Sequence, residues 1–329
     1  MSRKVHLLVI YSNTMMDKTY EMEADELMKK GNKEIESIGF FDNHFGDGEE
    51  KRTKRTCKFY KSASNKYKQA KLWEKAGDAL METATKIKTV KYSDYSLLVN
   101  YKDAIDCYLT ECTKQMTPSI FEKVNLCSDM VETTYLNDGK FYEAGKMSEN
   151  IGDHFERNNY LTDALTKYNH ANEYYGAVTG KKTTDPTIGC SIKIANIYAY
   201  LGKYQEALKK FDYVANCYQN QVQSSTPSLG YLGLKIKEIW VDCSICMAQI
   251  GDLVALHKAF DKYCSQQPDF IKSSSGRNIE LIITALENSD AVFFRSLALD
   301  YADGNWRCKA LGGIADRIEQ EDLVGEDFC

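Results

Sequence analysis

One short pattern recurs along this chain and constrains its fold more than any other feature. A turn residue is followed by an aromatic side chain and then, within the next helical turn, by alanine. In such a unit the aromatic ring closes the turn and the small alanine lets a second helix approach closely, as in tetratricopeptide-like repeats. Three clear copies and two looser ones are residues 138–144, 159–165, 202–208, 101–105 and 72–77.

The prolines show a second regularity, because three of the four are 41 residues apart. Each follows Asp, Thr or Gln and precedes an apolar-periodic stretch, which is the setting of proline at the first position of a helix. These are Pro186, Pro227 and Pro268, and Pro118 after Thr117 has the same setting. The spacing exceeds the period of about 34 residues in the standard repeat, so we expect helices longer by about one turn each.

The chain is therefore predicted to be all-α, a right-handed twisted sheet or superhelix of tetratricopeptide-like antiparallel helical hairpins. The repeat weakens beyond about residue 228 while the apolar content stays high, which favours a compact C-terminal helical bundle. The predicted divisions are an N-terminal extension at 1–15, the hairpins at 16–227, the bundle at 228–318 and an acidic tail at 319–329.

The composition of this 329-residue chain, 43% hydrophobic and 27% charged, is typical of a soluble globular protein. Its net charge of -5 gives no general affinity for nucleic acid. Eleven cysteines, an odd number without regular spacing, indicate reduced thiols and a cytoplasmic protein. No stretch approaches the roughly 18–20 apolar residues that cross a bilayer, so we expect any membrane contact to be peripheral.

Residues that carry catalysis or bind metal do not gather in the sequence. The five histidines are scattered, and none forms an HExxH motif or another metal pair at i and i+4. Cys243 and Cys246 have the spacing of a metal or redox pair, but their apolar helical context favours two buried thiols. Residues 176–183 imitate a phosphate-binding loop but are one residue short of its spacing and follow a helix. We therefore expect an adaptor with no enzyme activity, no cofactor and no metal.

Residues 38–49 are the segment most informative about function. Phe40, Phe41 and Phe45 lie among Gly, Asp and Asn residues, which break helices and favour turns. Aromatic rings on a loop beside a cationic helix suit contact with the cytosolic face of a membrane, and the alternative is that the rings fold back into the core. The basic run that follows contains Lys51, Arg52, Lys54, Arg55, Lys58 and Lys61.

Taken in order, these segments resemble a known family. The motifs are the phenylalanine loop, residues 60–63, 70–77, 139–146 and 204–207, and Asn305-Trp306 before an acidic tail that contains leucine. Over roughly residues 16–323 the chain resembles the soluble NSF attachment proteins, adaptors that bring the N-ethylmaleimide-sensitive fusion ATPase to SNARE complexes. The phenylalanine loop makes it similar to the alpha form more than to the gamma form. The resemblance implies a twisted sheet of helical hairpins, a C-terminal bundle and no catalytic activity.

The resemblance also implies a basic surface that contacts the SNARE complex, a syntaxin-type four-helix bundle. One position departs from the family, since Gly189 stands where the family has a lysine, and Lys181 or Lys182 in the preceding loop is the alternative cation. For each lysine, the plain alternative is an ordinary solvated residue of a helix. The matching positions are Lys140, Lys146, Lys193 and Lys237.

At the C-terminus the family ends in acidic residues with a nearly terminal leucine that engages an NSF-type AAA ATPase. Glu321, Asp322 and Leu323 match that signature, but six further residues follow. Phe328, which is also preceded by acidic residues, is the alternative anchor. Residues 1–14 have no family counterpart, and they are expected to be an extension or to precede the true start.

Three functions are consistent with these patterns to different degrees. The resemblance implies a SNAP-type adaptor that binds assembled SNARE complexes and recruits and stimulates the ATPase for SNARE disassembly, in vesicle fusion and intracellular protein transport. The alternative is a generic tetratricopeptide-like scaffold, which predicts a period of about 34 residues and a compact carboxylate clamp. An enzyme that carries helical repeats comes third, because no set of catalytic residues is recognisable.

Overall fold

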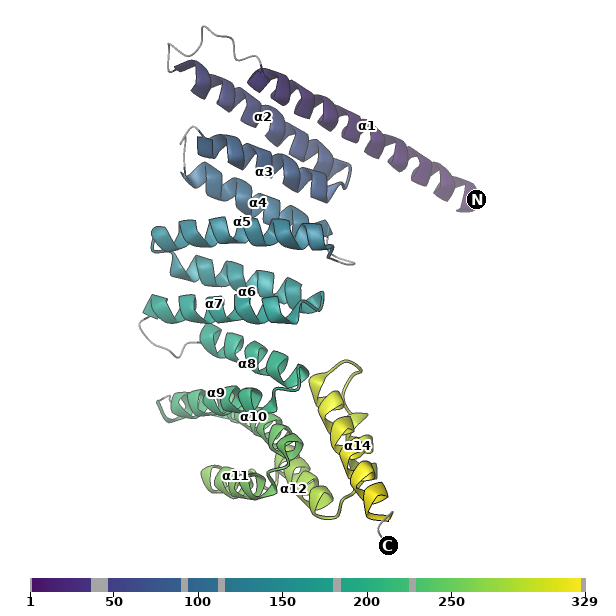
Figure 1. The fold of residues 1–329 in the computed structure, drawn as a ribbon, viewed down its shortest axis with the longest axis vertical. Coiled ribbons are helices and arrows are strands. Elements are labelled where there is room, and N and C mark those ends of the chain that lie inside the picture. Colours follow the sequence, from purple (N-terminus) through teal and green to yellow (C-terminus); the bar gives the residue numbers. More distant parts are fainter. Residues whose placement is uncertain are drawn as a thin grey trace. The chain divides into compact units, whose positions relative to one another are not determined.

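The computed structural model describes residues 2–36, 47–89, 94–111, 116–179, 185–224 and 229–326. Within these residues it contains fourteen α-helices and no strand, which confirms the predicted all-α fold (Figure 1). The helices are α1 (Ser2–Glu36), α2 (Asp47–Gln69), α3 (Trp73–Thr89), α4 (Asp94–Glu111), α5 (Pro118–Asn137), α6 (Phe141–Arg157), α7 (Leu161–Thr179), α8 (Asp185–Tyr200), α9 (Tyr204–Ser224), α10 (Leu229–Ile250), α11 (Leu253–Gln266), α12 (Ser274–Glu287), α13 (Ala291–Ala298) and α14 (Trp306–Glu326).

The chain divides into two compact units, which we call the N-terminal unit (residues 1–159) and the C-terminal unit (residues 160–329). In the N-terminal unit each helix from α1 to α5 packs against the next one along the chain, so α1–α6 form a stack of antiparallel hairpins (Figure 1). In the C-terminal unit α7–α10 stack in the same way, and α14 packs against both α8 and α10. The hairpin architecture is thus as predicted, and the division at residues 15, 227 and 318 stays a prediction.

The pattern of turn, aromatic and alanine marks hairpin turns, as predicted. Gly139, Asn159 and Gly202 lie between successive helices with φ of 71°, 64° and 74°, in the left-handed region that glycine and asparagine tolerate. The alternate helices α5, α7 and α9 begin at residues 118, 161 and 204, a period of 43 residues. The alanine of each copy is fully buried against a neighbouring helix; these are Ala144, Ala164 and Ala207.

The proline prediction is confirmed at Pro118 and wrong at Pro268, while Pro186 is the second residue of α8 and Pro227 lies outside the described residues. Pro118 is the first residue of α5, and the hydroxyl of Thr117 caps that helix by accepting a backbone N–H. Pro268 does not begin a helix, because it lies in a turn and α12 starts only after its N-cap, Ser273. The intervening turn places Phe270 in the core, where it is fully buried.

Close contact between tyrosine and glycine holds successive helices of the N-terminal unit together. A Cβ atom at Gly77 of α3 would lie 2.5 Å from the ring of Tyr108 on α4, so only glycine fits there. The Tyr108 hydroxyl donates a hydrogen bond to Asp78 at 2.8 Å. The same arrangement joins α1 and α2, where Tyr60 packs on Gly31 and donates to Asn32 at 2.6 Å.

The core of the C-terminal unit is aromatic and fixes α14 in place. Trp240 of α10 stacks on Tyr263 with ring centroids 4.5 Å apart. Trp306, the first residue of α14, stacks on Phe211 at 5.7 Å and donates its indole N–H to Asn196 of α8 at 3.0 Å. The helix that carries the acidic C-terminal residues is therefore held by contacts with α8 and α9.

A buried ion pair adds a second attachment of α14, this time to α10. Arg307 donates two hydrogen bonds to the carboxylate of Asp242, at 2.5 Å and 2.7 Å. Burial raises the pKa of the Asp242 carboxyl, and the guanidinium of Arg307 opposes this rise. Since the Asp242 side chain is only 3% exposed, its charge depends on Arg307 for stabilisation.

The predicted buried thiols are present on α10. Cys243 and Cys246 are free and buried, and burial raises the pKa of both thiols. Such thiols act as small apolar side chains in the core. No helix in the described residues is both long enough and apolar enough to span a membrane.

Candidate functional site

Two pockets define one face of the N-terminal unit. A pocket of about 510 Å³ lies between α4 and α6, with Tyr135 of the intervening helix α5 as part of its lining. A second pocket, of about 420 Å³, lies between α2 and α4, with Ile87 of the intervening α3. Because each pocket joins alternate helices, α2, α4 and α6 expose side chains on the same side, which we call the α2–α4–α6 face.

Lys146, one of the predicted SNARE-binding lysines, lies on this face in the pocket between α4 and α6. Lys102 of α4 joins it there, with its ammonium 5.7 Å from the ring centroid of Tyr135. The hydrogen bond with Tyr135 raises the pKa of Lys102. Glu143, Glu149 and Asp153 line the same pocket, which makes the site polar and of mixed charge.

Sequence reasoning missed Lys102, although residues 101–105 were recognised as a copy of the repeat. No local pattern marks it, because Lys102 becomes a neighbour of Lys146 only where α4 and α6 meet over Tyr135. Lys140 itself occupies the N-cap position of α6 and donates a hydrogen bond to Asp138 at 2.8 Å. This hydrogen bond raises the pKa of the exposed Lys140 side chain.

The other two predicted lysines belong to the C-terminal unit. Lys193 on α8 is half-buried, with its ammonium 5.0 Å from the ring centroid of Tyr168 on α7. Three and seven residues further along α8, Asn196 and Tyr200 contact α14 through Trp306 and Lys309. Lys193 therefore lies on the same face of α8 as Asn196 and Tyr200, about one helical turn before the part of that face that α14 contacts.

Lys237 and Gly189 complete the predicted set. Lys237 is half-buried on α10, and Gly189 lies within α8 with open space where a side chain would project. Lys181 and Lys182, the alternative cations, lie outside the described residues. A cation that sequence reasoning missed is Lys309 of α14, whose ammonium lies 5.2 Å from the ring centroid of Tyr200.

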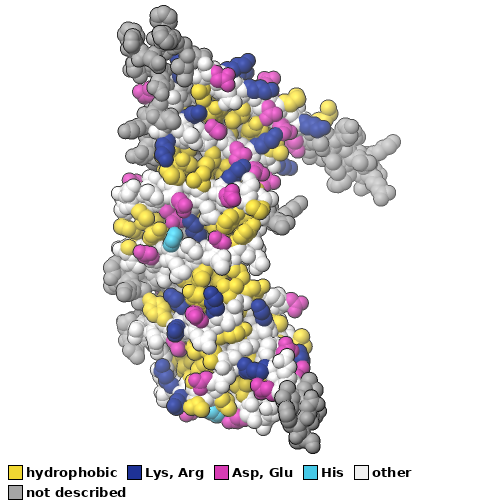
Figure 2. Space-filling model, in the orientation of Figure 1, with side chains coloured by type: hydrophobic (Ala, Val, Ile, Leu, Met, Phe, Trp, Pro, Cys, Tyr) yellow, Lys and Arg dark blue, Asp and Glu magenta, His cyan; other side chains and the backbone are white. Residues whose placement is uncertain are grey.

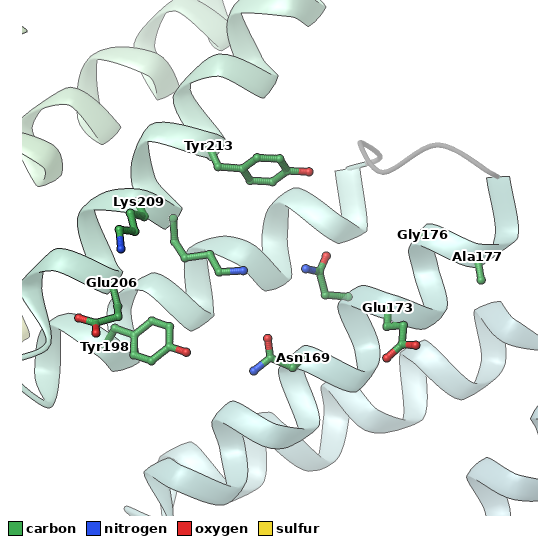
Figure 3. A pocket seen from close by; sticks show the side chains of 10 residues that line it. Asn169, Glu173, Gly176, Ala177, Tyr198, Glu206, Lys209 and Tyr213 are labelled. Carbon is green, nitrogen blue, oxygen red and sulfur yellow. The ribbon is translucent and has the colours of Figure 1, made fainter.

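The C-terminal unit also has a pocket of about 820 Å³ between α7 and α9, over α8. Figure 3 shows Asn169, Tyr198 and Tyr213 directed into the space between these helices. The side-chain N–H of Asn169 donates to the Leu165 carbonyl at 2.8 Å, which leaves the side-chain oxygen of Asn169 as the acceptor toward the pocket. Lys209, Lys210 and Glu206 of α9 add charged groups to the lining.

The predicted ATPase-binding residues lie at the end of α14 or beyond it. Glu321 is exposed, whereas Asp322 and Leu323 belong to the helix but their side chains are not among those described, and Phe328 lies outside the described residues. Arg295 of α13 binds Glu319 at 2.6 Å and Asp316 at 2.9 Å. Its hydrogen bond lowers the pKa of Glu319.

Glu321 points away from this ion-paired cluster. It follows Glu319 by two residues, which corresponds to about 200° around a helix. The charges of Asp316 and Glu319 are matched by Arg295 on one side of α14, and Glu321 presents its charge on another.

The predicted membrane-contact residues, Phe40, Phe41 and Phe45, lie outside the described residues, between α1 and α2. On the face displayed in Figure 2, basic and acidic side chains are interspersed with hydrophobic patches. Among the residues that the structure describes, no three His, Cys, Asp or Glu side chains gather closely enough to hold a metal ion.

Comparison with known proteins gives a consistent result. The family model described as soluble NSF attachment protein, SNAP, matches residues 22–307. The alpha-soluble NSF attachment protein of Vitis vinifera is 24% identical over 311 residues, which cover 93% of this chain and 97% of that protein. The beta form of Bos taurus is 27% identical over 277 residues, and the alpha form of Homo sapiens is 25% identical over 287 residues. The match to the Bos taurus protein covers 82% of this chain and 85% of that protein. The match to the Homo sapiens protein covers 85% of this chain and 88% of that protein.

Proposed function

We propose that this chain, which belongs to the soluble NSF attachment protein family, is an adaptor that binds assembled SNARE complexes and recruits and stimulates an NSF-type ATPase. The observation that carries this proposal is the family match, which extends over residues 22–307. In this role the chain acts in vesicle fusion and intracellular protein transport, on the cytosolic face of membranes. ATP hydrolysis belongs to the partner, and the adaptor itself catalyses nothing.

The SNARE complex is proposed to bind through the predicted lysines. Lys140 and Lys146 of the N-terminal unit and Lys193 and Lys237 of the C-terminal unit supply positive charge, and we add Lys102 because it shares a pocket with Lys146. An acidic helical bundle would be attracted to these cations, which speeds association and makes it sensitive to salt.

The ATPase is proposed to bind the end of α14. Glu321 and Asp322 would attract a basic domain of the ATPase, and Leu323, or alternatively Phe328, would fill an apolar pocket on it. The ion pairs of Arg295 with Asp316 and Glu319 support this arrangement, because they attach α14 to α13 on the side away from Glu321.

Membrane contact is proposed for the phenylalanine loop. Burial of one phenylalanine contributes roughly 1.5–3 kcal/mol, so three rings would give reversible association. Replacement of Phe40, Phe41 and Phe45 by serine should abolish liposome binding and leave disassembly of soluble SNARE complexes nearly unchanged. If the triple variant unfolds, the rings belong to the core and the proposal for this loop is wrong.

The decisive experiment measures whether the chain bridges a soluble SNARE complex to the ATPase. In a pull-down on immobilised SNARE complex, the ATPase should be retained only when this chain is present. The double variant Lys102→Glu/Lys146→Glu should weaken SNARE binding, whereas Lys29→Glu/Lys30→Glu, with the same change in charge on exposed positions of α1, should not. Equal loss in both variants would mean that total charge, and not the α2–α4–α6 face, determines binding.

The pocket between α7 and α9 favours a second candidate, a scaffold that binds extended peptides. Asn169 and Tyr198 could bind peptide groups, and Lys209 or Lys210 a carboxylate. Fluorescence polarisation with acidic C-terminal peptides tests this function. Binding that Lys209→Glu/Lys210→Glu abolishes, in a chain that fails to bridge SNARE complex and ATPase, would favour the scaffold.

A further inference from the structure

Five of the eight basic residues of α2 fall into two groups with different surroundings. One group faces α1 and meets its carboxylates: Arg55 binds Glu34 at 2.7 Å, and Lys66 binds Glu23 at 2.6 Å. These cations are matched within the fold. The other group, Lys54, Lys58 and Lys61, recurs at the spacing of one helix face and lines the pocket between α2 and α4.

That pocket is basic throughout its described lining. Besides the three lysines it contains Thr53, Cys57, Ile87 and Ser96, and no Asp or Glu is among the described residues that line it. Lys54 binds Glu50 of its own helix at 2.7 Å, but Lys58 and Lys61 have no ion-pair partner in the described part of the chain. The volume of about 420 Å³ falls within the range of small-ligand sites.

Positive charge reaches the interior of this pocket from two helices. Cys57 is 8% exposed, and its thiol lies 3.9 Å from the Thr83 carbonyl of α3. Burial raises the pKa of the Cys57 thiol, while the ammonium groups of Lys61 on α2 and Lys86 on α3 act in the opposite direction. Both lysines are therefore close enough for their fields to act at the buried wall of the pocket.

We propose that this pocket binds the phosphorylated headgroup of an anionic lipid, a phosphoinositide. A phosphomonoester offers two negative charges and three acceptor oxygens, which suit several lysines and a hydroxyl. The inference rests on the proposed membrane contact, because the three lysines of the pocket lie seven to fourteen residues, or about 10–21 Å along the helix, from the start of α2, which follows the phenylalanine loop in the sequence. A membrane that touches the loop would bring lipid headgroups close to this pocket. A freely diffusing phosphate compound would not need a site near the membrane-contact loop.

The test compares vesicles of equal total charge that contain either phosphatidylserine or phosphatidylinositol bisphosphate as the anionic lipid. In co-sedimentation with the full chain, we expect binding to the phosphoinositide vesicles to be at least about tenfold tighter. Lys58→Glu/Lys61→Glu should remove this preference, and Lys58→Arg/Lys61→Arg should keep it. The matched control Lys29→Glu/Lys30→Glu should keep the preference even if overall binding to both vesicles falls.

An equal affinity of the unmodified chain for the two vesicles would overturn the inference, and so would a preference that survives Lys58→Glu/Lys61→Glu. Soluble inositol trisphosphate serves as a second probe. If it binds through Lys58 and Lys61 while the vesicles are not distinguished, the ligand is a free phosphate compound and the lipid assignment is wrong. Bridging of soluble SNARE complex to the ATPase, measured without vesicles, reports separately on the proposed adaptor function.

Discussion

The substitution Asp242→Asn tests how firmly α14 is attached to the rest of the C-terminal unit. Asp242 accepts two hydrogen bonds from Arg307, and its side chain is 3% exposed whereas that of Arg307 is 26% exposed. The guanidinium also lies 5.1 Å from the Trp306 ring centroid. Asparagine keeps the shape of the side chain but removes its charge, and its amide nitrogen cannot accept the second hydrogen bond.

Loss of one partner from a buried ion pair destabilises a protein by about 3–5 kcal/mol. Water reaches part of the Arg307 side chain in this structure, so we expect the lower end, about 3 kcal/mol. For a domain of this size that corresponds to a fall in Tm of roughly 6–12 °C. Asp242→Leu/Arg307→Met, which replaces the pair by apolar side chains, should recover more than half of the loss.

Thermal and urea unfolding followed by circular dichroism measure these effects. Arg295→Gln, which removes the exposed ion pairs with Asp316 and Glu319, is the matched control and should leave the Tm nearly unchanged. The reasoning is refuted if Asp242→Asn melts within about 2 °C of the unmodified chain, or if the double variant is no more stable than the single one.

Three further substitutions test other parts of the structure. Gly77→Ala should destabilise the chain by about 1–3 kcal/mol, because the added methyl group would collide with the Tyr108 ring. The control Gly233→Ala, at a position with open space around it, should not destabilise the chain. Urea unfolding measures the stability of both variants. Burial lowers the pKa of His154 in the folded chain. As the pH falls below about 6.5, the unfolded chain binds a proton at this histidine more readily than the folded chain does, so the free energy of unfolding should decrease. His154→Gln should flatten this slope in Tm measurements between about pH 7 and pH 5; an unchanged slope would assign it to other groups. Leu323→Ala should reduce stimulation of the ATPase without affecting SNARE binding, and deletion of 324–329 should be nearly silent; the reverse result would transfer the role to Phe328.

The hairpin fold could be predicted because its determinants are local. A turn with positive φ favours glycine, as at Gly139 and Gly202, and the close approach of the next helix favours alanine. Both requirements therefore appear in the sequence as a glycine and an alanine only a few residues apart. The position of Pro268 could not be assigned in the same way. Its turn is set by the burial of Phe270 against Trp240, a contact across 30 residues of sequence that no local pattern reveals.

The candidate site could be predicted only in part, for the same physical reason. Helical spacing identifies which lysines share a face of one helix, but the groups opposite that face come from other hairpins. Lys146 was expected from the family resemblance, while its neighbour Lys102 became visible only when α4 and α6 were brought together over Tyr135. The ion pairs that α2 makes with α1 are equally hidden in the sequence.

Lys123 and Lys58 of the N-terminal unit differ in whether the fold matches their charge. Lys123 of α5 bridges to Glu74 and Asp78 of α3, at 2.9 Å and 2.7 Å, so its charge is matched within the fold. Lys123→Glu would place a third carboxylate beside these two and should destabilise by roughly 1–2 kcal/mol, because two half-exposed ion pairs are lost and repulsion replaces them. Lys58→Glu, on the α2–α4–α6 face, removes no ion pair among the described residues and should leave the Tm within about 2 °C of the unmodified chain. If both variants melt alike, the matched and unmatched lysines do not differ in role, and the assignment of the α2–α4–α6 face to ligand binding loses its physical basis.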